Sequence, residues 1–78
     1  MRKGKATEQI LSVLADGEEY GLGIIQNLKA RDSKPPSLGG LYVILHRLEK
    51  AGIVTARWGE TMPERNGARR RYYQLKDK

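Results

Sequence analysis

The chain combines a length of 78 residues with no cysteine, one histidine and a formal net charge of +6. A chain of this length forms one small domain. It cannot form a disulfide or a site of several histidines. It contains neither an apolar run long enough to span a bilayer nor the apolar segment of a signal peptide. The excess of lysine and arginine is typical of domains that bind nucleic acids, and we expect a cytoplasmic, nucleoid-associated protein.

The N-terminal segment predicts a basic arm followed by a helix. We expect residues 1–5 to be disordered and the hydroxyl of Thr7 to cap the helix. Gly17 is suited to the left-handed conformation that often ends a helix, so the helix stops there. Between these points, apolar residues recur on one helical face, at Ile10, Leu11, Val13 and Leu14.

A short strand, a second helix and a stiff turn are predicted next. One or two residues of the segment 18–20 are expected to form a strand that pairs with a later hairpin. The second helix spans about residues 22–31, and its apolar face carries Leu22, Ile25 and Leu28. Two consecutive prolines at positions 35 and 36 then prevent this helix from continuing, which separates it from the third helix.

The third helix is predicted over residues 37–51, with Ser37 as its N-cap and Gly52 just beyond its end. One face of this helix is apolar and carries Leu38, Leu41, Ile44, Leu45 and Leu48. The opposite side is uncharged near its start and basic further along, and it carries Gly39, Gly40, Tyr42, Val43, His46, Arg47 and Lys50. No acidic residue occurs between positions 33 and 48.

The C-terminal part predicts a hairpin with a basic return strand. We expect a strand over residues 53–58, a polar loop over 59–67 and a second strand over 68–75. Because alternate residues of a strand point to opposite faces, Tyr73 and Leu75 are expected to face the core and Arg70 to point away with Tyr72. Trp58 is expected to pack at the edge of the core or to stack on an arginine of this hairpin.

This order of elements predicts one α+β (mainly α) domain over residues 1–78, a winged helix-turn-helix with three helices and a two- to three-stranded antiparallel wing. In that fold the third helix enters the major groove of DNA, and the wing, here about residues 57–75, lies on the backbone or in the minor groove. The candidate DNA-binding residues are Ser37, Gly39, Gly40, Tyr42, Val43, His46, Arg47, Arg65, Arg69, Arg70 and Arg71.

Several of these candidates have a second interpretation. Gly39 and Gly40 allow DNA to approach the backbone closely, pack against a neighbouring helix, or merely fray the start of the helix. The hydroxyl of Tyr42 can meet a phosphate or a base, and its ring can contact a thymine methyl, or the side chain is simply half-buried. Arg47 reaches a phosphate or a guanine edge, or it pairs with Glu49, Glu60 or Glu64. His46 is expected to be a surface polar residue or a phosphate contact rather than a switch or a metal ligand.

No catalytic arrangement is visible in the sequence. The serines and His46 form no plausible triad, and Gly21-Leu22-Gly23 lacks the remainder of a dinucleotide-binding motif. We therefore expect a protein that is not an enzyme and needs neither a cofactor nor a metal.

The motifs of the third helix and the hairpin together resemble one bacterial family. The run Leu41-Tyr42-x-x-Leu45-x-Arg47-Leu48-Glu49-x-x-Gly52-Ile53, followed by Trp58 and by Arg70-Arg71-Tyr72-Tyr73-x-Leu75, is similar to the PadR family of transcriptional regulators, as is the earlier Tyr20-Gly21-x-x-Ile24. The resemblance covers nearly the whole chain. It implies a winged-helix DNA binder, usually a repressor, that binds an inverted repeat in double-stranded DNA as a homodimer, with Tyr42 at the DNA surface.

The sequence departs from the family pattern in two respects. Family members normally continue into a long C-terminal helix that builds the dimer, whereas this sequence ends directly after the second strand of the wing. Either the sequence is trimmed, or the dimer is built from the first helix and its flanks. In addition, Gly39-Gly40 makes the start of the third helix more flexible than is usual in the family.

Two other functions are compatible with the same pattern. A non-specific DNA-architectural or mobile-element accessory protein would use the same basic hairpin with little sequence preference. A winged helix that binds another protein would pack its third helix on that partner, and its DNA binding would be absent or independent of salt.

Overall fold

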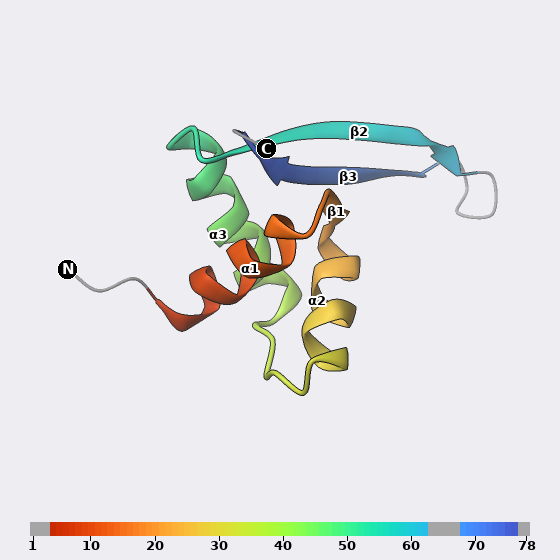
Figure 1. Ribbon diagram of the computed structural model, residues 1–78. Helices are drawn as coiled ribbons and strands as arrows, with labels where there is room; N and C mark the ends of the chain where they lie inside the picture. Colours follow the sequence, from red (N-terminus) through yellow and green to blue (C-terminus); the bar gives the residue numbers. More distant parts are fainter. Residues whose placement is uncertain (1–3, 63–67, 77–78) are drawn as a thin grey trace.

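A computed structural model of the chain describes residues 4–62 and 68–76. These residues form three helices and a three-stranded antiparallel sheet with the strand order β1-β3-β2 (Figure 1). The elements in chain order are α1 (Lys5–Ala15), β1 (Glu19–Tyr20), α2 (Gly21–Ala30), α3 (Leu38–Lys50), β2 (Val54–Met62) and β3 (Ala68–Leu75). The winged arrangement expected from the sequence is therefore confirmed.

The start of α1 differs from the prediction. The helix begins at Lys5, and its N-cap is Gly4, which has an extended backbone and provides no side-chain hydrogen bond. Thr7 consequently lies inside the first turn, so its predicted role as the cap is wrong, and Lys5 belongs to the helix rather than to a disordered arm. Residues 1–3 of that predicted arm lie outside the described residues.

The buried face of α2 is also rotated relative to the prediction. Ile24, Ile25 and Leu28 are buried, whereas Leu22 is 43% exposed. The reason is that α2 begins at Gly21, and Gly21 and Gly23 both lie against neighbouring side chains at its start. The apolar positions that face the core therefore follow the spacing 21, 24, 25 and 28, which leaves position 22 on the side.

The limits of α3 agree with the prediction. The backbone N–H of Gly40 donates a hydrogen bond of 3.1 Å to Oγ of Ser37, which confirms the N-cap, and Gly52 follows the helix with a φ of 77°. Leu41, Leu45 and Leu48 are buried as expected. Leu38, by contrast, is 45% exposed, because it lies in the first turn at the rim of the core.

The hydrophobic core is shared by all three helices and by two strands. It comprises Ile10, Val13, Leu14, Ile24, Ile25, Leu28, Leu41, Leu45, Leu48, Val54 and Tyr73. None of the described polar or charged residues other than tyrosine is buried in it. Since each buried leucine or isoleucine contributes about 1.5–3 kcal/mol, this small core fixes how α3 and the sheet lie relative to each other.

The hairpin extends well beyond this core. Residues of β1 pair with β3 at Glu19↔Tyr73 and Tyr20↔Tyr72, which confirms the short pairing strand. The bounds of β3 agree with the prediction, but β2 continues to Met62 through a shift of register between Trp58 and Thr61. The predicted loop over 59–67 is therefore wrong for residues 59–62, and its remainder lies outside the described residues.

Candidate nucleic-acid interface

The side of α3 opposite to its buried leucines presents a continuous exposed stripe. Gly39, Val43, His46 and Lys50 follow one another at intervals of four, three and four residues, and all four are exposed. We call them the outer stripe. It contains no carboxylate, and its first half is small and apolar, so base edges can approach the helix closely there.

The two glycines at the start of α3 are not explained by packing. A Cβ added to Gly39 would have no atom within 4 Å other than those of its chain neighbours and of the nearby helix backbone. A Cβ on Gly40 would meet only Oγ of Ser37 at 3.2 Å and Cβ of Pro36 at 3.9 Å. The interpretation that these glycines pack against a neighbouring helix is therefore wrong. Close approach of a partner to this turn remains the prediction, with fraying of the helix start as its alternative.

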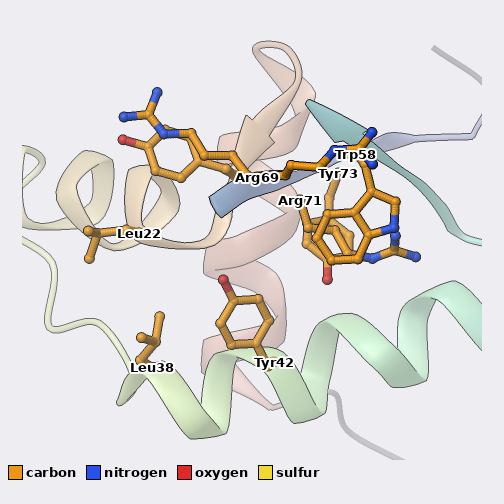
Figure 2. A pocket seen from close by; sticks show the side chains of 9 residues that line it. Leu22, Leu38, Tyr42, Trp58, Arg69, Arg71 and Tyr73 are labelled. Carbon is orange, nitrogen blue, oxygen red and sulfur yellow. The ribbon is translucent and has the colours of Figure 1, made fainter. Parts of the chain in front are cut away.

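Tyr42 lies on the flank of α3 that faces the sheet rather than on the outer stripe. Its side chain is 40% exposed, and its ring crosses to the start of α2 (Figure 2). A Cβ on Gly21 would lie 2.4 Å from the hydroxyl oxygen of Tyr42, so only glycine at position 21 leaves room for this ring. The side chain is thus half-buried, and its hydroxyl lies at the surface groove described next.

A groove of about 330 Å³ separates the start of α3 from the sheet. It is lined by Tyr20, Leu22, Leu38, Tyr42, Trp58, Arg69, Arg70, Arg71 and Tyr73 (Figure 2). A second hollow of about 480 Å³ continues along α3 and shares Tyr42, Arg71 and Tyr73 with the first. The two form one surface channel between α3 and the sheet, which we call the furrow. The exposed Leu22 and Leu38, which sequence reasoning assigned to the core, lie at its edge.

The floor of the furrow carries a neutral phenol. Tyr73 is 5% exposed. Burial raises the pKa of its hydroxyl, and the nearby guanidinium of Arg71 offsets only part of that effect. The hydroxyl therefore keeps its proton at neutral pH and can donate a hydrogen bond.

The face of the hairpin that borders the furrow carries Trp58 with two arginines. The guanidinium carbon of Arg71 lies 4.8 Å from the centre of the indole ring system, and that of Arg69 lies 5.9 Å from it. Arg69 Nε also donates to the carbonyl of Gly59 at 2.9 Å, and Arg71 donates to a carboxylate oxygen of Glu49 at 3.3 Å. The expected stacking of Trp58 on an arginine of the hairpin is confirmed.

The opposite face of the hairpin is arranged differently. Arg57 donates two hydrogen bonds of 2.6 Å to the carboxylate of Glu18, and its guanidinium carbon lies 4.8 Å from the centre of the Tyr72 ring. These hydrogen bonds lower the pKa of Glu18 and raise that of Arg57. Arg70 lies over Tyr20 at 4.4 Å, and Tyr20 meets Tyr72 edge to face. Arg70 therefore points with Tyr72, as expected, although it also reaches the edge of the furrow.

Arg47 is exposed and, within the part of the chain that the structure describes, has no acidic partner within 4 Å. Glu49 pairs with Arg71 instead, so the proposed pairing of Arg47 with Glu49 is wrong. Arg65 and Glu64 lie outside the described residues. In the described ranges 4–62 and 68–76, no group of three acidic or histidine side chains is close enough to hold a metal ion, and none of the helices is both long and apolar enough to cross a membrane.

These features define a winged-helix domain with an exposed, acid-free stripe beside a basic hairpin. The model of the transcriptional regulator PadR-like family matches residues 10–78, and the chain belongs to this family. A comparison with curated proteins finds no match.

Solved structures of family members and related proteins superpose on most of the chain. A PadR family transcription regulator from Clostridium difficile is 28% identical with a TM-score of 0.74 over 92% of this chain. Pex from Synechococcus is 33% identical with a TM-score of 0.75 over 91% of it. PadR from Bacillus subtilis, crystallised with operator DNA, is 23% identical and shares the fold, with a TM-score of 0.75 over 91%. This chain spans 72%, 62% and 40% of those three chains, respectively.

Proposed function

We propose that this chain is the DNA-binding domain of a sequence-specific transcriptional regulator, a repressor that binds an inverted repeat as a homodimer. In this proposal α3 enters the major groove, and the hairpin from residue 57 to residue 75 lies on the adjoining backbone or in the minor groove. As a regulator of transcription it would act in the cytoplasm, at the nucleoid.

The observation that carries the proposal is the position of the outer stripe of α3 beside the arginine-bearing face of the hairpin. Tyr42, His46 and Lys50 border the same furrow as Arg71, so one duplex can meet both elements. Membership in the PadR-like family supports the assignment to transcription, and the operator complex of the Bacillus subtilis protein shows the fold on DNA.

The proposed contacts divide by their chemistry. Gly39, Gly40 and Val43 present backbone and small side chains for direct approach to base edges, while His46 and Arg47 lie further along the helix. The cationic contacts to the sugar-phosphate backbone come from Arg69, Arg70 and Arg71. Ser37 uses its hydroxyl as the N-cap, so its proposed role is to hold the first turn of α3 in place against the DNA.

The test is a selection from a random DNA pool, followed by titration of the selected and a mixed duplex at two salt concentrations. A dimeric regulator is expected to enrich an inverted repeat whose half-sites lie about ten base pairs, or ~34 Å, apart. Tight binding without enrichment that collapses with salt would instead indicate an architectural DNA binder. Absence of DNA binding at low salt would refute both and favour a protein partner.

A further inference from the structure

Trp58 occupies an unusual position for the single tryptophan of a small domain. Its side chain is 52% exposed, and it lies outside the core. In the register of the hairpin it stands opposite Arg71, and the guanidiniums of Arg71 and Arg69 lie over its ring. Figure 2 shows this group on the sheet side of the furrow, across from Tyr42.

Two neighbours of Arg71 compete for its guanidinium, which also lies close to the hydroxyl of Tyr73. The indole ring of Trp58 attracts the guanidinium but leaves its charge intact. The carboxylate of Glu49 also attracts it, but neutralises the charge, and the contact of 3.3 Å is longer than the 2.7–2.9 Å that is usual for strong charged hydrogen bonds. Within the described residues, the neighbouring Arg69 donates a hydrogen bond to a neutral carbonyl, that of Gly59, and lies over the Trp58 ring. Both arginines therefore keep positive charge at the furrow.

We propose that Trp58 is a positioning residue for DNA binding, whose indole holds Arg71 and Arg69 at the furrow, where they meet a backbone phosphate. Glu49 opposes this arrangement by drawing Arg71 toward itself. The inference rests on the proposed function in DNA binding and adds to it the residue that keeps these two cations in place. When the indole ring is removed, the carboxylate of Glu49 still attracts Arg71, and the ring no longer opposes that attraction.

The opposite face of the hairpin provides a matched control. Arg57 has the same charge as Arg71 and the same 4.8 Å distance to an aromatic ring, but it is paired with Glu18 by two short hydrogen bonds. If position at the furrow matters, removal of Arg57 will affect DNA binding much less than removal of Arg71.

The experiment measures the dissociation constant of one DNA duplex as a function of salt for the full chain and its variants. Trp58→Leu is expected to weaken binding about three- to tenfold, and Trp58→Phe to restore most of the loss. Arg71→Ala is expected to weaken binding and to reduce the slope of log K against log salt by about one. Arg57→Ala is expected to leave that slope unchanged. Circular dichroism and thermal unfolding of each variant report whether it folds.

Two further variants separate positioning from a direct contact or a general loss of stability. In the Arg71→Ala background, Trp58→Leu should have less than about half of its effect on the logarithm of the affinity, because only Arg69 remains to be held. Glu49→Gln keeps the size of the side chain and should strengthen binding about two- to fivefold and steepen the salt dependence, because Arg71 loses its competing carboxylate.

Different results would overturn different proposals. Equal effects of Trp58→Leu with and without Arg71, or weaker binding by Glu49→Gln, would refute the positioning role even if the wild-type chain binds DNA well. Should Trp58→Leu fail to fold, Glu49→Gln still decides the question. If the wild-type chain binds no duplex, the proposed function itself fails.

Discussion

The two faces of the hairpin use the same residue types for different purposes. On both faces a guanidinium lies 4.8 Å from an aromatic ring. On the face of the hairpin that points away from the furrow, which we call the outer face, that guanidinium belongs to Arg57. It joins the hairpin to Glu18, which directly precedes β1. On the furrow face it belongs to Arg71, whose carboxylate contact is single and longer. A count of arginines in the sequence does not distinguish a cation used to fasten the hairpin from one left for a ligand.

The outer face is closely packed around Gly59. A Cβ on Gly59 would lie 2.6 Å from Cε2 of Tyr72 and 3.3 Å from the carbonyl oxygen of Arg70. Tyr72 in turn contacts Tyr20 and Arg57. The side chains that cover Gly59 therefore cannot shift without disturbing several contacts of β1 and β2.

A clear loss of stability is accordingly expected for Gly59→Ala. Inserting a methyl group under the Tyr72 ring should lower the free energy of unfolding by about 1–3 kcal/mol, which is typical of overpacking. The control is Gly39→Ala, where a Cβ meets no atom within 4 Å and alanine has the better helix propensity. Urea denaturation measures both. Equal stability of the two variants would show that the outer face is not closely packed.

On the furrow side the expected effects concern DNA rather than stability. Tyr42→Ala removes a side chain that is 40% exposed, and we expect it to reduce the preference for the selected inverted repeat over mixed DNA by about tenfold, close to the ~1–3 kcal/mol of one good base contact. Tyr42→Phe retains the ring and removes the hydroxyl. Competition titrations with the two duplexes measure the preference.

The comparison of the two Tyr42 variants identifies the contact. If Tyr42→Phe behaves like the wild type, the ring makes the contact, as with a thymine methyl. If it weakens binding to both duplexes alike, the hydroxyl contacts a phosphate. An unchanged affinity of Tyr42→Ala for both duplexes, with the fold intact, would remove Tyr42 from the interface.

Much of this arrangement was predictable because it depends on local patterns. The Ser37 cap, the limits of α3 and the bounds of β3 follow from residues that are neighbours in sequence. The opposite directions of Arg70 and Tyr73 follow from the alternation along one strand. The stacking of Trp58 was predictable because the paired strand carries three consecutive arginines.

The remaining features depend on how distant elements meet. Leu22 and Leu38 carry the helical spacing of core residues, but each lies in the first turn of its helix, where the neighbouring element no longer covers it. Gly21 gives no local sign that it accommodates the ring of Tyr42. Arg57 and Glu18 are 39 positions apart, so no local pattern pairs them. The extension of β2 past Trp58 depends on backbone pairing across a shifted register, which a polar sequence does not reveal.

The smallest expected effect concerns the ion pair between Glu18 and Arg57, and it is measured as a dependence of stability on pH. The pKa of Glu18 is lowered below 4.5 in the folded chain, chiefly by hydrogen bonds from Arg57. Because the folded carboxylate binds its proton less readily than the unfolded one, its contribution to stability is complete above pH 4.5 and is lost as the pH falls through the lower folded value. The side chain of Arg57 is 57% exposed and that of Glu18 is 28% exposed, so solvent screens the pair and its contribution is that of a surface ion pair.

Glu18→Gln should therefore be slightly less stable than the wild type near neutral pH. The difference between the two should shrink as the pH falls below 4.5 and disappear once the pH has passed the lower folded pKa of Glu18. Thermal unfolding across this pH range measures the difference, and Glu8→Gln, at an exposed position in the first turn of α1, is the control for loss of a carboxylate.

DNA affinity of Glu18→Gln at neutral pH completes the comparison of the two faces of the hairpin. Releasing Arg57 should leave the salt slope unchanged, because that guanidinium lies on the face away from the furrow. A steeper slope would mean that the outer face also reaches DNA, and that the pairing with Glu18 limits how much charge the hairpin presents.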